Sequence, residues 1–178
     1  MYVALGMTTF RADEARNTVR LVTPEGALRK PYHKRALYGW DEANYTPGVG
    51  AGGVHLVDGV RIGLRICYEV RFPEYFRELF RRRVQLAVVS FADGGPIRAK
   101  YDVMLAHLVS RAAENVMYVL SANSVSLPQV APTCLVDPDG RLVCRAPPNE
   151  EALVTGTITV DPPSFGRLGR IRHSSRLV

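Results

Sequence analysis

The apolar positions of the chain group into short runs whose spacing predicts strands and helices in turn. The runs "VQLAVVSFA" (84–92) and "VMYVLSANS" (116–124) are almost continuously apolar, which is typical of strands buried on both faces. The segment between them, 97–115, predicts the longest helix of the chain. Residues 72–83, "FPEYFRELFRRR", place apolar side chains at helical spacing behind a proline near the first turn, and so predict another helix.

Turn-forming residues divide the other apolar positions into hairpins and single strands. A buried strand is predicted at 2–7 and a further strand at 151–160. Hairpins combined with strand–helix–strand units indicate a layered α/β protein with a mixed sheet. Because no repeat, linker or low-complexity tract interrupts the pattern, we expect a single domain over residues 1–178. The predicted hairpins are 17–30, 54–67 and 134–146, which turn about Pro-Glu-Gly, Asp58-Gly59 and Pro138-Asp139-Gly140.

The composition excludes several classes of protein. Apolar residues make up 47% of the chain and charged residues 22%, as in soluble globular domains. No apolar run approaches the roughly 20 residues that cross a bilayer, and the start lacks the features of a signal peptide, so a cytoplasmic location is expected. The three cysteines form no disulfide framework, and no cysteine or histidine pair has metal-ligand spacing, so we expect no zinc and no other metal.

The net charge of +6 comes almost entirely from arginine. A basic surface can bind nucleic acid through its phosphates. However, the strongest cluster, "RELFRRR" (77–83), fits the solvated end of a helix, where arginines complement the helix dipole, and no nucleic-acid motif accompanies it. We therefore interpret the charge as an arginine-rich surface. The basic tail, 166–178, is expected to be poorly packed unless a partner subunit holds it.

Cys67 is the residue whose position most favours chemistry. It follows the apolar strand "VRIGLRI" and precedes the helix expected near residue 72, and side chains at such corners can be exposed at a sheet edge. The Tyr68 N–H can donate to an oxyanion there, and the nearby helix N-terminus favours a thiolate. The alternative is that Cys67 is a buried small hydrophobe, as free cysteines usually are.

The long loop at 34–53 contains a second set of polar residues. Lys34 enters this loop from a strand, and a lysine beside a thiolate can lower its pKa or stabilise an oxyanion. Considered alone, Lys34 fits a surface lysine and Glu42 a solvated acid. A loop of this length within a compact domain is usually functional or disordered.

Four segments, taken in order, resemble the nitrilase, or carbon–nitrogen hydrolase, superfamily. "PYHKRALYGWDEANYTPG" looks like its lysine block and "VDGVRIGLRICYEVRFPE" like its cysteine block. "LVSRAAENVMYVLSANS" resembles the helix-to-strand segment that follows, and "CLVDPDGRLVCRA" is similar to its later hairpin. The resemblance extends from Asn17 to about Val160.

The resemblance implies an α-β-β-α sandwich with mixed sheets and a Glu–Lys–Cys catalytic set. Cys67 would be the nucleophile, and Lys34 would hold the oxygen of the tetrahedral intermediate with help from the Tyr68 backbone. Glu42 would be the additional glutamate that orients substrate and lysine. Phe91 and Ala92 would line the substrate pocket, and no cofactor is implied.

The first glutamate of that set, the general base, has no counterpart in the expected setting. Asp13 and Glu14 lie between predicted strands and Glu25 lies in a hairpin turn. The family's opening strands and helices likewise have no counterpart before the strand at 2–7. The chain is interpreted as a fragment, as a natural short member that kept binding or assembly, or as one that a partner chain completes. Missing edge elements leave apolar faces open, so we expect a homo-oligomer.

The function implied is hydrolysis of a carbon–nitrogen bond through a cysteine thioester. The substrate would be a small linear amide, a carbamoyl compound or a nitrile. Transfer of the acyl group to another acceptor uses the same thioester and remains open. The alternative function is that of a catalytically inactive binding or assembly protein with the same fold, because the general-base glutamate is lacking.

Overall fold

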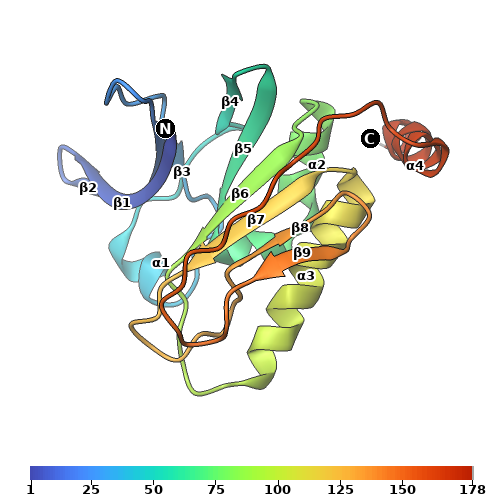
Figure 1. Cartoon of the computed structure of the whole chain (residues 1–178). Coiled ribbons are helices and arrows are strands. Elements are labelled where there is room, and N and C mark those ends of the chain that lie inside the picture. Colours follow the sequence, from blue (N-terminus) through green and yellow to red (C-terminus); the bar gives the residue numbers. More distant parts are fainter. Residues whose placement is uncertain (178) are drawn as a thin grey trace.

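The computed structural model describes residues 1–177 and contains two separate β-sheets (Figure 1). The small sheet is antiparallel and has the order β1-β2-β3, whereas the large sheet has the order β4-β5-β6-β7-β8-β9. The helices and strands of the chain, in sequence order, are β1 (Val3–Arg11), β2 (Glu14–Val22), β3 (Tyr32–His33), α1 (Trp40–Asn44), β4 (Val54–Val57), β5 (Val60–Ile66), the 3₁₀ helix η1 (Cys67–Arg71), α2 (Pro73–Arg81), β6 (Leu86–Phe91), α3 (Ala99–Asn115), β7 (Tyr118–Asn123), β8 (Cys134–Val136), β9 (Leu142–Arg145) and α4 (Phe165–Arg176).

The centre of the large sheet is parallel, and its edges are antiparallel. Strands β5, β6 and β7 run in the same direction, while β4 pairs with β5, and β8 with β7, in the opposite direction. Asp58 and Gly59 both have positive φ at the β4–β5 turn, which is the geometry of a tight hairpin. The predicted mixed sheet and the hairpins at 54–67 and 134–146 are confirmed.

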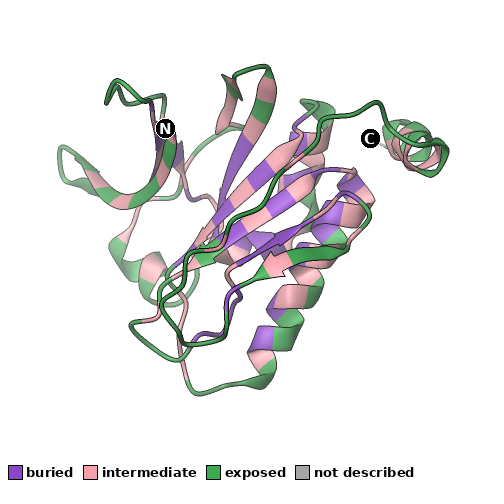
Figure 2. Ribbon diagram, viewed as in Figure 1, coloured by how far each residue is buried: buried purple, intermediate pink, exposed green. Residues whose placement is uncertain are grey.

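Helices α2 and α3 cover one face of the large sheet and form the main core with it. Phe76 and Leu79 of α2 and Leu108 of α3 are fully buried there, against alternate residues of the central strands such as Val89 and Val119. This burial is the main stabilising term of the fold. Figure 2 shows the same alternation along β6 and β7.

The small sheet packs on the opposite face of the large sheet. Val19 of β2 and Tyr32 of β3 contact Leu64 and Ile66 of β5 in a second buried cluster. The result is a helix layer, a large sheet and a partial second sheet, which confirms the predicted layered α/β sandwich. Because the second sheet is partial, Val88 of β6 and Leu120 of β7 are only half-buried, and the prediction that these two strands are buried on both faces was wrong.

The first hairpin of the chain differs from the prediction. The strand predicted at 2–7 forms as β1, but it pairs with β2 along its whole length, and its side chains Val3, Leu5 and Phe10 are exposed. The turn at Pro-Glu-Gly is followed by a single bridge between Val22 and Leu28 rather than by a strand. The predicted burial of 2–7 was wrong, because β1 is an edge strand at the open side of a three-stranded sheet.

The C-terminal part also departs from the prediction. Residues 151–164, here called the C-terminal strap, cross the large sheet as extended chain without strand pairing, so the strand predicted at 151–160 was wrong (Figure 1). The tail forms α4, which packs against α3 instead of being poorly packed. Arg170 donates to the carbonyl of Ala113 and Ser174 to that of Glu114, so α4 binds the last turn of α3. Val178 of the predicted tail lies outside the described residues.

Within residues 1–177, no helix combines the length and the apolar character that a membrane crossing needs.

Candidate active site

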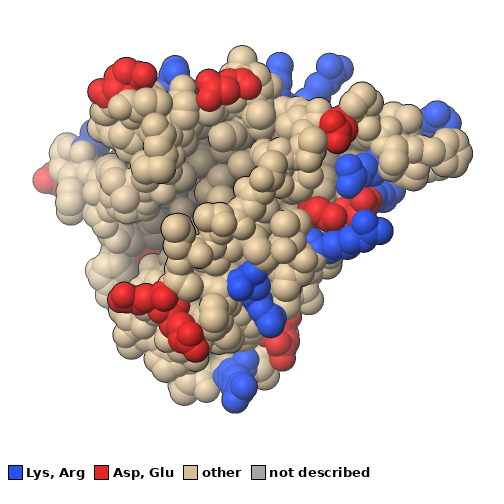
Figure 3. Space-filling model, viewed as in Figure 1, with Lys and Arg blue, Asp and Glu red and all other residues tan. Residues whose placement is uncertain are grey.

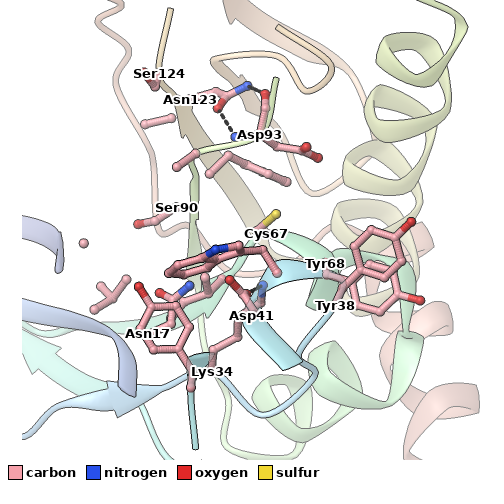
Figure 4. Close-up of a pocket in the computed structure, with 18 of the residues that line it drawn as sticks. Asn17, Lys34, Tyr38, Asp41, Cys67, Tyr68, Ser90, Asp93, Asn123 and Ser124 are labelled. Atoms are coloured by element: carbon pink, nitrogen blue, oxygen red, sulfur yellow. Dashed lines mark hydrogen bonds and ion pairs between the residues drawn. The ribbon is translucent and has the colours of Figure 1, made fainter. Parts of the chain in front are cut away.

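Cys67 lies where the parallel strand β5 ends and the short helix η1 begins. Its backbone has φ +47°, in the left-handed region that non-glycine residues occupy at a cost of about 1–2 kcal/mol. Ile66 before it is buried in extended conformation, so the chain turns sharply at the cysteine. This turn directs the sulfur into a cavity instead of into the sheet (Figure 4).

Glu69 fixes that turn from within the core. The side chain is fully buried and accepts hydrogen bonds from the Ile66 N–H at 2.8 Å, the Arg35 N–H at 2.9 Å and the Tyr32 hydroxyl at 2.7 Å. One carboxylate therefore joins the end of β5, the start of η1 and the segment that follows β3. Sequence reasoning missed this role. The available sequence signal was an acidic residue between the apolar residues Ile66 and Val70. A carboxylate buried in such a setting needs several hydrogen-bond donors.

Lys34 follows β3 and is buried, with 4% of its surface exposed. Its ammonium forms an ion pair with Asp41 of α1 and lines the same cavity as Cys67. Figure 4 shows Lys34 and Asp41 on one side of Cys67, and Asp93 and Asn123 on the other. The structure therefore brings the predicted cysteine and lysine together.

The cavity lies between the small sheet and the C-terminal ends of the parallel strands β5, β6 and β7. It has a volume of about 1050 Å³, at the upper end of the range for small-molecule sites. Figure 3 shows the molecule hollowed beside the β1–β2 hairpin. Met7 and Asn17 line the cavity from that hairpin. The position at the carboxyl ends of parallel strands is where open α/β sheets usually bind ligands.

The far wall of the cavity carries a second ion pair. The ammonium of Lys100 in α3 contacts both carboxylate oxygens of Asp93, at 2.9 and 3.1 Å. Asn123, at the end of β7, accepts from the Asp93 N–H and donates to the Asp93 carbonyl, so it holds this residue in place. Sequence reasoning did not single out these three residues.

The other predicted site residues divide into two groups. Tyr68, Phe91 and Ala92 line the cavity, and the ring of Tyr68 stacks on that of Tyr38 with centroids 4.6 Å apart. Glu42 is exposed and does not line the cavity, whereas its neighbour Asp41 contacts Lys34. Adjacent residues of a helix point about 100° apart. The sequence "WDEAN" offers no way to tell which of its two acids faces inward.

The electrostatic environment of Cys67 differs from the expectation of a favoured thiolate. Burial raises the pKa of the Cys67 thiol to about 11, although Lys34, Lys100 and the Tyr68 N–H act to lower it. Asp93 acts in the same direction as burial. Cys67 therefore rests as a thiol at neutral pH, because the low polarity of the site outweighs the nearby positive charges.

The arrangement can place an electrophilic carbon against the sulfur of Cys67 while Lys34 and a backbone N–H approach the attached oxygen. Within residues 1–177, no cluster of histidine, cysteine, aspartate or glutamate side chains is grouped to hold a metal ion.

Comparison with known proteins gives one family and several relatives. The sequence profile of the Carbon-nitrogen hydrolase family matches residues 1–162. A hydrolase of Mycobacterium tuberculosis is 35% identical over 127 residues, which cover 67% of this chain and 45% of that protein. An (R)-stereoselective amidase of Pseudomonas is 30% identical and covers 81% of this chain and 53% of its own length. For 2-oxoglutaramate amidase of Bacillus subtilis the identity is 27%, with 89% and 62% covered.

Solved structures give the same fold. A mutant of the amidase from Nesterenkonia sp. AN1, with acrylamide added to its active-site cysteine, has a TM-score of 0.75 and 24% identity, and the match covers 99% of this chain and 69% of that one. A second mutant of that amidase, in complex with butyramide, has a TM-score of 0.71 and 23% identity, with 82% and 57% covered. This chain spans about half the length of the curated relatives that it matches.

Proposed function

Because the chain belongs to the carbon–nitrogen hydrolase family, we propose that the cavity around Cys67 is the site of a cysteine-dependent amide hydrolysis. The observation that carries the proposal is the shared position of Cys67 and Lys34. Both side chains line one cavity, at the end of a parallel strand, with the Tyr68 N–H beside the sulfur.

The proposed reaction has two halves, in which Cys67 is the nucleophile. Its sulfur attacks the carbonyl carbon, and the electrons of the C=O bond move to the oxygen. Lys34 and the Tyr68 N–H stabilise this oxyanion. The C–N bond then breaks, the nitrogen takes up the proton that the thiol has given up and leaves as ammonia or an amine, and a thioester remains. Water attacks the thioester, releases the carboxylic acid and returns the thiol.

The first half requires a base, because Cys67 rests as a thiol. Asp41 and Asp93, the carboxylates that line the cavity within residues 1–177, are ion-paired with Lys34 and Lys100. We assign Asp41 the task of orienting Lys34, since it is in contact with the ammonium. A catalytic role for Glu42 remains a prediction.

The substrate class is proposed from the relatives. Two of them are amidases by name, and butyramide and acrylamide occupy structures of the Nesterenkonia amidase. A small linear amide is therefore the proposed substrate, and a carbamoyl compound or a nitrile would be attacked by the same sulfur. We also propose a homo-oligomer in the cytoplasm. The exposed apolar side chains Val3, Leu5 and Phe10 on β1 support association.

One observation favours the second candidate, an inactive binding protein. The raised pKa of Cys67, together with the pairing of both cavity carboxylates in the described chain, leaves no free base beside the sulfur. In this case the cavity would bind an amide without turnover.

Alkylation by acrylamide tests whether Cys67 is the reactive sulfur. We expect Cys67 to be labelled before the fully buried Cys134, with a rate that rises about tenfold per pH unit and levels off near pH 11. The rise follows because only the thiolate adds to the acrylamide double bond, and its fraction grows until the pH reaches the pKa. Peptide mass spectrometry over a pH series gives the rate at each cysteine.

Charge variants provide the control for this experiment. Lys34→Met should slow labelling of Cys67 at a given pH, and Asp93→Asn should speed it, because the two charges shift the pKa in opposite directions. Lys30→Met, which removes an exposed lysine outside the cavity, should leave the rate unchanged. Labelling of Cys67 no faster than that of Cys134, or equal rates in all three variants, would contradict the proposed nucleophile.

A further inference from the structure

The wall of the candidate active-site cavity carries more positive than negative charge. Lys34 is paired with Asp41, and Lys100 is paired with Asp93. Arg71 also lines the cavity, but it takes part in none of the ion pairs within residues 1–177. Because Asp41 and Asp93 are the carboxylates of this lining in the described chain, one positive charge of the wall has no acid to offset it.

Arg71 brings its charged group, and not only its backbone, to this wall. It is the last residue of η1, four positions after Cys67. Its guanidinium carbon lies 6.0 Å from the centre of the Tyr68 ring, and Tyr68 lines the cavity. Figure 4 shows that ring stacked on the ring of Tyr38, to the right of Cys67 in the view. The unpaired charge therefore lies beside the space in which a substrate would meet the sulfur.

Helix α3 holds Arg71 in place and adds a second cation on the same side. The guanidinium of Arg111 in α3 donates to the Arg71 carbonyl at 2.9 Å. Lys100 and Met104, one turn apart on α3, line the cavity. Burial, Arg111 and Arg71 all act to lower the pKa of His107, which lies one turn further along this helix. Arg71 and Lys100 therefore both present positive charge on the α3 side of the cavity.

Lys100 keeps a hydrogen-bond donor in spite of its ion pair. An ammonium group has three N–H donors, and the contacts with the Asp93 carboxylate, at 2.9 and 3.1 Å, use two of them. Burial raises the pKa of Cys67, and the charge of Lys100 is among those that act to lower it, so the ammonium and the sulfur lie within electrostatic reach of each other. A short molecule bound at the sulfur would therefore extend to this donor.

We infer that the amide hydrolysed at Cys67 carries a carboxylate in its acyl part, so that its substrates are monoamides of short dicarboxylic acids. The inference rests on the function proposed for this cavity. Figure 4 places Asp93, the partner of Lys100, on the opposite side of Cys67 from Lys34. An acyl chain that leaves its carbonyl oxygen near Lys34 would extend toward the α3 side. There its carboxylate would accept the free N–H of Lys100 and offset the excess positive charge.

Three amides of equal length test this preference for negative charge. Succinamate ends in a carboxylate, butyramide in a methyl group and 3-aminopropanamide in an ammonium group. Their affinities are measured by protein NMR titration of the whole chain with Cys67→Ala, in which hydrolysis does not interfere. Succinamate should bind about tenfold more tightly than butyramide, because it gains charge-assisted hydrogen bonds. 3-Aminopropanamide should bind about fivefold more weakly than butyramide, because its ammonium meets like charge.

Variants of Arg71 in the same background separate the cavity from general attraction of anions to a basic protein. Arg71→Gln should weaken succinamate about tenfold and leave butyramide unchanged. Arg71→Lys keeps the charge and should retain most of the preference for succinamate. Arg98→Gln is the matched control. It removes an equal charge from an exposed residue just before α3, outside the cavity, and should change neither affinity.

The outcomes distinguish this inference from the proposed function. Equal affinities for succinamate and butyramide, no saturable binding of succinamate, or equal losses in Arg71→Gln and Arg98→Gln would overturn the inference. Ammonia release by the unsubstituted chain is measured separately. Hydrolysis of butyramide without preference for succinamate would keep the function and reject the inference. Preferred binding of succinamate without ammonia release would keep the preference for anionic amides and reject the hydrolysis.

Discussion

Cys67→Ala should lower the release of ammonia from butyramide by at least about 10³-fold, because it removes the only atom proposed to bond to the substrate carbon. The expectation is for a loss of chemistry and not of structure. Alanine keeps the Cβ, so the backbone strain at φ +47° is unchanged, and a single sulfur at the cavity wall is removed. Ammonia release at saturating butyramide measures the effect.

Cys144→Ala is the matched control for that result. It makes the same chemical change at a half-buried cysteine of β9, outside the cavity, and should retain full activity. Thermal unfolding of both variants shows whether they remain folded. Unchanged hydrolysis in Cys67→Ala would rule out the proposed nucleophile. Butyramide binding without turnover in the unsubstituted chain would instead support the inactive binding protein.

Glu69→Ala should destabilise the fold by roughly 3–5 kcal/mol, the range for breaking a fully buried charged network. The substitution leaves the Tyr32 hydroxyl and the N–H groups of Arg35 and Ile66 buried without their acceptor. Such a loss is a large part of the stability of an ordinary domain. Urea unfolding followed by circular dichroism measures the change in free energy of unfolding.

Two further variants provide reference values for the loss of stability expected of Glu69→Ala. Tyr32→Phe removes one of the three donors and should cost about 1 kcal/mol. Glu74→Ala removes an exposed acid from the first turn of α2 and should change stability by less than about 0.5 kcal/mol. If Glu69→Ala cost no more than Tyr32→Phe, the carboxylate would not be what holds the turn at Cys67.

The elements that were predicted best are those whose apolar face packs against another element of this chain. Helices α2 and α3 and strands β5, β6 and β7 contact one another, so each buries one apolar face, although β6 and β7 are not buried on their second face. The segment 151–160 alternates in the same way as a strand, but no described strand pairs with it, and Leu153 is 91% exposed. Periodicity shows which face of a strand is apolar and not whether a partner strand exists.

From the sequence, the candidate site could be located to the segments that carry Lys34 and Cys67, but not every side chain that faces the cavity could be identified. The sequence placed Cys67 at a strand end and Lys34 in the loop before it, because both follow from the order of strands and turns. It could not choose between Asp41 and Glu42, which depends on the rotation of a single helical turn. Nor could it predict the raised pKa of Cys67, since burial arises from the packing of two sheets distant in sequence.

The left-handed backbone at position 67 bears on why a cysteine stands there. Glycine would adopt that conformation without the steric strain that a side chain carries, although glycine also loses more backbone freedom on folding. The shape of this corner therefore does not itself require a side chain. The strain at Cys67 is understandable as part of presenting a sulfur to the cavity.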